Sequence, residues 1–218
     1  MNRILVLLLL SGLIFATSCS KAPEGEKTEA SEKETVKESS GEVVNININP
    51  DESMVMWTGS KPTGQHNGIV RDIAGNFQVN ENDEIVGGKF ILDLRSLEDQ
   101  DLTPEDGKEK LENHLKSADF FDVANHPQAL FQITDLKAQE GEGYNHMVSG
   151  NLTIKDTTLN ISFPAMIQQE NGKIMANTPP FTIDRTKWGI KYRSGAIGTI
   201  KDKLIHDEIG LELKIQAG

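Results

Sequence analysis

A long alternation of apolar and polar residues between positions 144 and 167 constrains the fold more than any other feature of this sequence. From Tyr144 to Lys155, one set of alternate residues is mainly apolar and the other set is mainly polar. After a turn near Asp156, the alternation resumes with Leu159 and continues to Ile167. Because successive side chains of a β-strand point to opposite faces of its sheet, this pattern predicts two strands, each with one buried and one wet face.

The same alternation recurs along most of the remaining chain, at positions 43–48, 54–59, 69–79, 90–95 and 205–215. Only residues 104–116 have the spacing of an amphipathic helix, with Thr103 as the expected N-cap and Pro104 as the first helical residue. Roughly eight or more strands and one main helix predict an all-β fold over residues 43–218, either an antiparallel barrel or a sandwich.

Residues 1–18 have the features of an export signal. They combine the basic Arg3 with an apolar run and with small residues before Cys19, and they are too short to be a spanning helix. The segment from Ala16 to Cys19 resembles a lipoprotein cleavage box, although leucine is commoner at the position of Ala16. Cys19 is the only cysteine of the chain, so we expect it to be acylated and to anchor the protein in a membrane. A buried or free thiol is the alternative.

Residues 19–42 are expected to form a disordered acidic tether that follows the lipidated cysteine. Glu, Lys, Ser and Thr dominate this segment, and Val36 is its only bulky apolar residue. A segment of this composition buries too little apolar surface to offset the entropy lost on ordering. The whole chain has a formal net charge of −11, which argues against a nucleic-acid partner.

The stretch from His114 to Ile133 leads out of the expected helix and into a strand. Phe120 and Phe121 lie between the two elements, and Pro127 marks a break before the strand. These aromatic side chains form either a lid over a β-rich body or the core of an ordinary crossover. The local pattern leaves both interpretations open.

The residues also leave open whether a barrel of this kind is hollow. A barrel of about eight strands is either filled by its own side chains or able to hold one small ligand. Gly87, Gly88 and Gly150 lie in or beside expected strands, where glycine leaves space, and aromatic residues make up only 6% of the chain. These features favour a cavity, whereas glycines that mark bulges in a solid interior are the alternative.

Several motifs, in a fixed order and spacing, resemble those of the YceI-like family. They are HLKSADFF at 114–121 with Pro127 after it, FQI at 131–133, GNLTIKD at 150–156 and DRTKWGIKY at 184–192, and WTGSKPTGQHNG at 57–68 resembles lipoprotein members. Asp156 replaces a usual glycine, and Trp188 stands where many members have phenylalanine.

The resemblance covers residues 52–217. It implies an antiparallel, eight-stranded, lipocalin-like barrel with one main α-helix inserted between strands. It also implies an elongated apolar cavity for a polyisoprenoid, quinone-like or fatty chain, with no catalysis, no metal and no cofactor.

Given this resemblance, we expect the apolar faces of the strands to line the cavity, with two further aromatic residues at its mouth. The expected lining residues are Phe90, Leu92, Leu94, Phe131, Ile133, Val148, Leu152, Ile154, Phe163, Ile183, Ile209 and Leu211, and the expected mouth residues are Phe120 and Phe121. For each of them, ordinary core packing is the alternative.

Three polar residues are candidates for contact with the polar head of a ligand. His146 lies on the apolar face of its strand, and Asp184 and Arg185 precede Trp188. The alternatives are a hydrogen-bonded core histidine and an arginine–carboxylate pair that fixes a loop.

Sequence motifs for other chemistry are absent. The spacing of His66, His114, His126, His146 and His206 matches no zinc pattern, so no metal site is expected. The sequence also lacks a GxSxG motif and a glycine-rich phosphate loop.

The sequence therefore predicts a non-catalytic envelope lipoprotein that carries or sequesters a long-chain apolar ligand. Ser20 rather than aspartate follows Cys19, which favours an exported protein on the outer membrane, facing the periplasm. One alternative is a structural or interaction lipoprotein with a filled barrel and a protein partner, and another is a hydrolase that uses His66 or His126. Homodimer formation is also left open.

Overall fold

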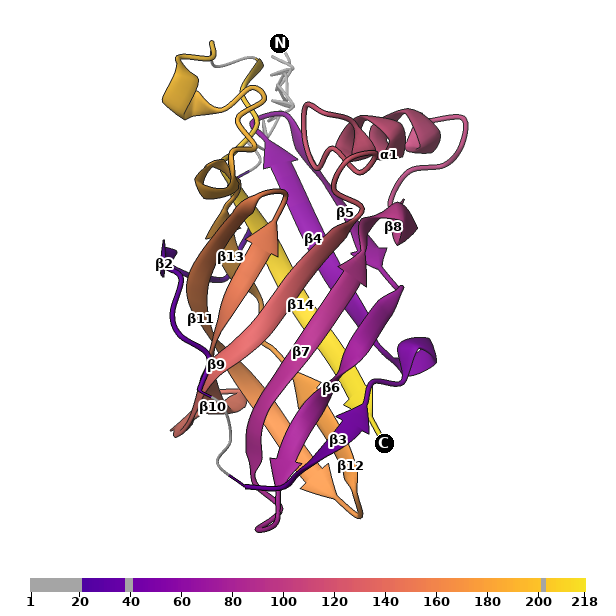
Figure 1. Cartoon of the computed structure of the whole chain (residues 1–218). Coiled ribbons are helices and arrows are strands. Elements are labelled where there is room, and N and C mark those ends of the chain that lie inside the picture. The colour runs from indigo at the N-terminus through magenta and orange to yellow at the C-terminus, as the bar shows by residue number, and fades with distance from the viewer. Residues whose placement is uncertain (1–20, 38–40, 201–202) are drawn as a thin grey trace, which may run out of the picture.

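The computed structural model describes residues 21–37, 41–200 and 203–218, which form a strongly curled β-sheet with one helix, α1 (Lys108–Lys116), at one end (Figure 1). The sheet has 14 strands. Their bounds are β1 (Glu26–Lys27), β2 (Ser31–Glu32), β3 (Val43–Asn47), β4 (Met54–Lys61), β5 (Gly64–Val70), β6 (Ile73–Asn80), β7 (Ile85–Asp93), β8 (Leu97–Asp99), β9 (Gln128–Gly141), β10 (Tyr144–Ile154), β11 (Thr157–Glu170), β12 (Lys173–Asn177), β13 (Phe181–Asp184) and β14 (Glu208–Ala217). Short 3₁₀ helices lie at η1 (Pro50–Glu52), η2 (Leu94–Ser96), η3 (Arg185–Trp188) and η4 (Gly195–Ile197).

The strand order explains why the sheet curls into a barrel. Neighbouring strands follow the order β3-β6-β7-β9-β10-β11-β12-β14-β4-β5-β8, and every pairing except that of β1 with β13 is antiparallel. A bridge between Ile48 and Ala217 brings the end of β3 beside β14, and the Gly218 amide donates to the Asn47 carbonyl across the same junction at 3.0 Å. The path from β3 to β14 thus closes at one end of the barrel, while β4, β5 and β8 continue the sheet beneath α1. The predicted all-β antiparallel barrel is confirmed, with more strands than the eight expected because several short strands extend the ring.

The alternating stretch that dominates the sequence forms the β10–β11 hairpin. Val148 lies opposite Phe163 and Leu152 lies opposite Leu159, so the apolar residues of both strands share one face. Lys155 lies in the turn between the strands and has a φ of 54°. Two-residue hairpin turns require such positive φ values. The opposite face carries polar pairs such as Thr153 and Thr158, whose hydroxyl groups are 2.8 Å apart.

Helix α1 begins four residues later than the sequence suggests. Gly107, with a φ of 99°, is the residue that precedes the helix, and residues 104–107 form turns. The Thr103 hydroxyl does accept a hydrogen bond from the Asp106 amide, at 3.2 Å, but it caps this preceding turn. The positive φ of Gly107 separates the turn from the helix because a right-handed helix requires negative φ. In the described part of the chain, no helix combines the length and apolarity that a bilayer span requires.

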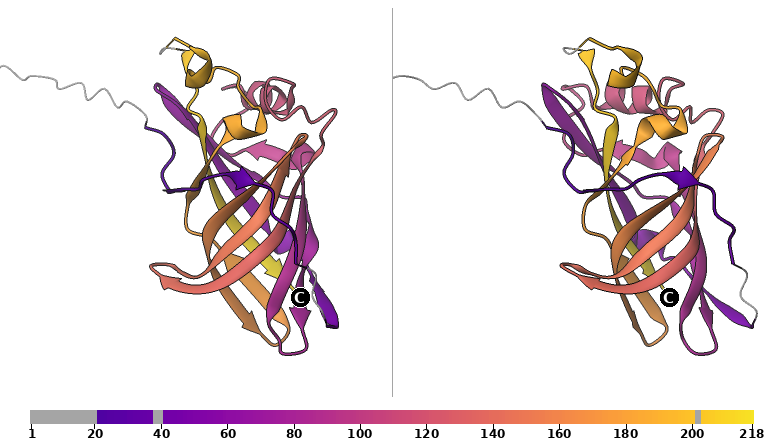
Figure 2. Two further views of the ribbon diagram at one scale, coloured as in Figure 1. Left: turned by 60° about the vertical axis from the view of Figure 1, so that its left-hand side comes forward. Right: turned by 90° about the vertical axis from the view of Figure 1, so that its left-hand side faces the viewer.

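The segment expected to be a disordered tether lies along the outside of the barrel instead, over its described residues 21–37 (Figure 2). β1 pairs with β13, and β2 pairs with β11, two strands that share no ladder in the described sheet. The Asn151 side chain exchanges two hydrogen bonds with the backbone of Glu34, at 3.0 and 2.7 Å. The composition of the segment does not predict this arrangement, because its hydrogen-bond partners are the edges of β11 and β13 and the buried side chain of Asn151. The expected signal segment, residues 1–18, and Cys19 lie outside the described residues.

Candidate functional site

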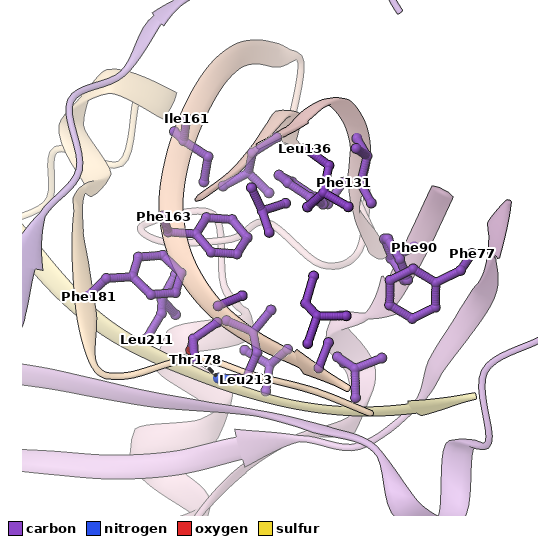
Figure 3. A pocket seen from close by; sticks show the side chains of 18 of the residues that line it. Phe77, Phe90, Phe131, Leu136, Ile161, Phe163, Thr178, Phe181, Leu211 and Leu213 are labelled. Carbon is purple, nitrogen blue, oxygen red and sulfur yellow. Dashed lines mark hydrogen bonds between the residues drawn. The ribbon is translucent and has the colours of Figure 1, made fainter. Parts of the chain in front are cut away.

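The candidate site is an apolar cavity of about 110 Å³ inside the barrel (Figure 3). Side chains from strands all around the ring converge on it. Its lining consists of Val55, Ile73, Phe77, Ile85, Phe90, Leu92, Phe131, Ile133, Leu136, Val148, Leu152, Ile161, Phe163, Ala165, Ile167, Ala176, Thr178, Phe181, Leu211, Leu213 and Ile215.

Thr178 is the only polar residue in this lining, and its hydroxyl oxygen and its amide are both bonded to the backbone of Leu213. Its hydroxyl accepts a hydrogen bond from the Leu213 amide at 3.0 Å, and its own amide donates to the Leu213 carbonyl at 3.1 Å. An ordered water needs two to four polar partners, so a cavity with this lining favours hydrocarbon over water.

Four phenylalanine rings form a continuous row along the inner wall. The centroid distances are 6.3 Å from Phe90 to Phe131, 5.5 Å from Phe131 to Phe163 and 4.6 Å from Phe163 to Phe181. Large planar side chains fill much of the barrel here, and rotation about their side-chain bonds is the simplest way in which the cavity can change shape.

Strand glycines do not leave empty space beside the cavity, contrary to the sequence-based interpretation. A Cβ atom on Gly150 would approach Phe131 Cζ to 2.2 Å, and one on Gly88 would meet Phe90 Cζ at 3.1 Å. These glycines let the neighbouring aromatic rings lie flat against the backbone. A Cβ on Gly87 would similarly approach the Gln78 side chain to 2.7 Å.

The structure brings eight of the fourteen expected ligand-binding residues to the cavity. These are Phe90, Leu92, Phe131, Ile133, Val148, Leu152, Phe163 and Leu211. Leu94, Ile154, Ile183 and Ile209 are instead packed in the surrounding core. Leu94 directly follows β7, and Ile154 and Ile209 lie nearer the ends of β10 and β14 than Leu152 and Leu211, which reach the cavity.

Phe120 and Phe121 lie in the connection that follows α1, away from the cavity lining. The Phe120 ring packs edge-on against His114, at 5.0 Å between centroids, and lies 5.5 Å from the ring of Tyr192. The guanidinium of Arg185 lies 5.9 Å from the Phe120 centroid. This cluster joins α1 to the loop after β13, and α1 lies at one end of the barrel (Figure 1).

Arg185, one of the expected head-group residues, is held by the protein itself. Its guanidinium donates to the carbonyls of Ile190, Ile205 and His206 at 2.8, 3.1 and 3.1 Å, and it forms an ion pair with Asp207 at 3.3 Å. Burial lowers the pKa of the Arg185 guanidinium, and Asp207 opposes that shift. A buried arginine remains protonated. The charged Arg185 side chain therefore holds the surrounding loops together at the α1 end of the barrel.

The other two expected head-group residues lie apart from each other. Asp184 accepts hydrogen bonds from the amide and the hydroxyl of Thr186, at 2.9 and 2.6 Å, and thereby caps η3. His146 lies on β10 with its Nδ1 atom 2.7 Å from Asn145 Oδ1. The three candidates therefore do not form one polar pocket.

Sequence reasoning missed lining residues on the strands that precede β7 and follow β11. Examples are Phe77 on β6, Phe181 on β13 and Leu213 on β14. The alternation in β6 and β14 was itself a usable signal, because it places Phe77 and Leu213 on an apolar face. β13 has only four residues and shows no alternation long enough to indicate its buried face.

Comparison with protein families gives one match that spans most of the chain: the model of the YceI-like domain matches residues 46–217. Among curated proteins, a UPF0312 protein of Pectobacterium carotovorum subsp. carotovorum is 37% identical over 94 residues, which are 42% of this chain and 40% of the relative. A UPF0312 protein of Pectobacterium atrosepticum is 36% identical over the same length. The chain thus aligns with about two fifths of the length of these curated relatives.

Solved structures with the same fold include BcnA of Burkholderia cenocepacia, at a TM-score of 0.62 and 18% identity over 78% of this chain and 99% of that one. A polyisoprenoid-binding domain from Saccharophagus degradans, implicated in plant cell wall breakdown, has a TM-score of 0.58 and 13% identity over 78% of this chain and 96% of that one. The YceI protein of Campylobacter jejuni has a TM-score of 0.51 and 18% identity, over 69% of this chain and 82% of that one. At these identities the likeness shows the fold.

Proposed function

Because the chain belongs to the YceI-like family, we propose that it binds a long-chain apolar ligand within its barrel and performs no catalysis on it. The observation that carries this proposal is the cavity lined by apolar side chains, in which the only polar residue, Thr178, is bonded through its hydroxyl oxygen and its amide to the backbone of Leu213. Each methylene group that moves from water into such a site contributes about 0.8 kcal/mol. A hydrocarbon chain therefore gains affinity along its length without any polar contact.

The size of the cavity requires the barrel to adapt when it binds such a ligand. At about 110 Å³ the cavity is somewhat smaller than an engineered protein cavity of ~150 Å³ that binds benzene. Pockets for larger ligands measure about 300–1,000 Å³. We propose that the phenylalanine row from Phe90 to Phe181 rearranges as the chain enters, since these rings line the inner wall of the cavity (Figure 3).

The related domain from Saccharophagus degradans is a polyisoprenoid-binding domain, which supports a polyisoprenoid, quinone-like or fatty-chain ligand here. The cavity argues against the alternative of a solid barrel that acts only through its surface. The proposed role is carriage or sequestration of the ligand, with the membrane as its source.

We further propose that the protein is an envelope lipoprotein, exported through residues 1–18 and anchored through acylated Cys19 on the outer membrane, facing the periplasm. The signal-like segment and the single cysteine at its end support this. Mass spectrometry of the N-terminal peptide should find two or three acyl chains on Cys19, and Cys19→Ala should release the protein from membranes. An unmodified Cys19 in a membrane-free protein would contradict the proposal.

The binding function is tested by reconstitution. The purified chain is freed of lipid and then titrated with a fluorescent fatty acid, and a polyprenol is added as competitor. We expect saturable binding and displacement by the polyprenol, whereas Leu152→Asp, which places a charge in the cavity, should abolish both. Failure of the unmodified chain to bind either probe would refute the proposal.

A further inference from the structure

A second site lies at the α1 end of the barrel, outside the apolar cavity. His66 on β5, Asp99 at the end of β8 and Asp101 just after β8 come together there, although His66 and Asp101 are 35 positions apart. One side-chain nitrogen or oxygen from each residue lies within 4.8 Å of the others. Pairing of Gly68 with Asp99 between β5 and β8 produces this meeting.

Asp99 is the unusual member of this cluster because it is 0% exposed and its Oδ2 atom has no hydrogen-bond partner. Its Oδ1 atom accepts hydrogen bonds from the amides of Asp101 and Leu102, at 3.2 and 2.7 Å, which fixes the carboxylate in place. Buried carboxylate oxygens normally have partners, since an unpaired one loses its hydration without compensation. Burial and the neighbouring Asp101 carboxylate raise the pKa of the Asp99 carboxyl, so this oxygen is completed either by a proton or by a cation that displaces it.

No lysine or arginine supplies that partner within the described part of the chain. The ion pair of Asp101 is with His66, at 3.0 Å, and Asp99 forms none. Lys108, on α1, is paired with Glu98 at 2.8 Å. The Lys108 charge also acts on Asp99, but its ion pairs are with Glu98 and Glu112, so no cation contacts the free Asp99 oxygen within the described residues.

From this arrangement we propose that His66, Asp99 and Asp101 bind a divalent transition-metal ion, with Zn²⁺ as the best-fitting ion. Imidazole nitrogens and carboxylate oxygens both ligate Zn²⁺, and three protein ligands leave a fourth position for water or another ligand. A hard cation such as Ca²⁺ prefers oxygen ligands alone, so the imidazole favours zinc. The side chains of His66 and Asp101 are 31% and 30% exposed, which leaves an entry path and room for the bound water.

Bonds of about 2.0–2.2 Å to one tetrahedral ion place the ligand atoms about 3.4 Å apart, whereas His66 Nδ1 and Asp101 Oδ2 are 3.0 Å apart and the three ligand atoms lie within 4.8 Å of one another. The two partly exposed side chains must therefore move toward the fixed Asp99 carboxylate. The metal replaces the proton that is shared between His66 Nδ1 and Asp101 Oδ2, and it links β5 to β8. The Asp99 amide donates a hydrogen bond to the Glu112 side chain on α1 at 2.9 Å. A metal bound at Asp99 therefore also stabilises the position of α1.

Two other histidines that face aspartates in the described part of the chain provide matched controls. His114 lies 3.1 Å from Asp119, and His126 lies 3.6 Å from Asp156 and 3.9 Å from Asp122. Neither pair includes a fully buried carboxylate with a free oxygen. If the buried oxygen creates the site, His66→Ala must weaken metal binding and His126→Ala must not.

The experiment uses the untagged chain, stripped of metal by a chelator and titrated with Zn²⁺ in a calorimeter. We expect one equivalent to bind, with a rise in the melting temperature and a tetrahedral absorption spectrum when Co²⁺ replaces Zn²⁺. His66→Ala and Asp99→Asn should each weaken binding at least about tenfold, and His126→Ala should bind like the unmodified chain.

Circular dichroism of the metal-free variants separates loss of the site from loss of the fold. Should Asp99→Asn unfold, Asp101→Asn, which changes a partly exposed side chain, replaces it. The proposal is overturned if the folded chain binds no Zn²⁺, if folded His66→Ala binds it unchanged, or if His126→Ala abolishes binding. Preferential binding of Ca²⁺ over Zn²⁺ would overturn the assignment to a transition metal.

Discussion

The rings of Phe163 and Phe181 are stacked nearly parallel, with centroids 4.6 Å apart and an interplanar angle of 6°. Phe163 belongs to β11 and Phe181 to β13, and these strands share no ladder in the described sheet. The stacked rings on the inside and the N-terminal segment on the outside, through β1 and β2, bridge them. Opening the wall at this seam breaks the pairings of β1 and β2 but no ladder between β11 and β13.

Removal of one ring of this pair should both destabilise the barrel and enlarge its cavity. Phe181 is 1% exposed and lines the cavity, so Phe181→Ala should lower the free energy of unfolding by about 3–5 kcal/mol. The same variant should accept bulkier apolar probes than the unmodified chain. Denaturant unfolding measures the first effect, and Val44→Ala, at a side chain 66% exposed, should change it by less than about 0.5 kcal/mol. Equal effects of the two substitutions would contradict the packing described.

The N-terminal segment should detach when its buried anchor is removed. Asn151 is 3% exposed and exchanges hydrogen bonds with the Glu34 backbone, so Asn151→Ala should lower stability by about 1–3 kcal/mol. Hydrogen exchange of the amides from residue 26 to residue 34 should accelerate in this variant. Asn125→Ala, at an exposed asparagine that bonds Asp122, serves as control. Unchanged exchange in Asn151→Ala would mean that other contacts hold the segment.

The glycine beneath Phe131 should tolerate no side chain. Gly150→Ala places a Cβ 2.2 Å from Phe131 Cζ, so the ring must leave its position, at a cost of about 1–3 kcal/mol. Gly59→Ala, in β4 with no atom within 4 Å of the new Cβ, should be neutral or stabilising by up to about 1 kcal/mol. Thermal unfolding of both variants gives the comparison, and equal melting temperatures would be evidence against the close approach.

Arg185 should act on stability far more than on ligand affinity. Arg185→Met leaves the carbonyls of Ile190 and Ile205 and the Asp207 carboxylate without their donor, which should cost about 3–5 kcal/mol. Arg95→Met, which breaks an exposed ion pair with Asp93, should leave stability nearly unchanged. Binding of the fluorescent fatty acid by folded Arg185→Met should match that of the unmodified chain. If folded Arg185→Met bound the fatty acid more weakly than the unmodified chain, Arg185 would contact the polar head of the ligand after all.

The sequence was sufficient to predict the class of fold and eight of the 21 residues that line the cavity. In long strands such as β10 and β11, the alternation of apolar and polar residues indicates which face is buried. That face contains Val148, Leu152 and Phe163. The family motifs supplied the barrel itself, which alternation alone could not distinguish from a sandwich.

The remaining features depend on contacts between distant segments. Whether Ile154 or Phe181 reaches the cavity depends on the curvature of the sheet, which no local pattern encodes. The order of residues 26–34 depends on Asn151, and the meeting of His66 with Asp99 depends on the pairing of β5 with β8. Arg185, near Trp188, was expected to contact the polar head of a ligand. Its guanidinium instead donates to backbone carbonyls, which come close to it only when the loops fold.

Native mass spectrometry of the protein purified from its own cells tests the central claim most directly. The account predicts an additional apolar mass on the unmodified chain and on Thr153→Asp, whose new charge lies on the outer face of β10. It predicts no such mass on folded Leu152→Asp, which differs by one position but places its charge in the cavity. An unmodified chain that carries no ligand and takes up no hydrocarbon, or an equal ligand mass on folded Leu152→Asp, would contradict the account.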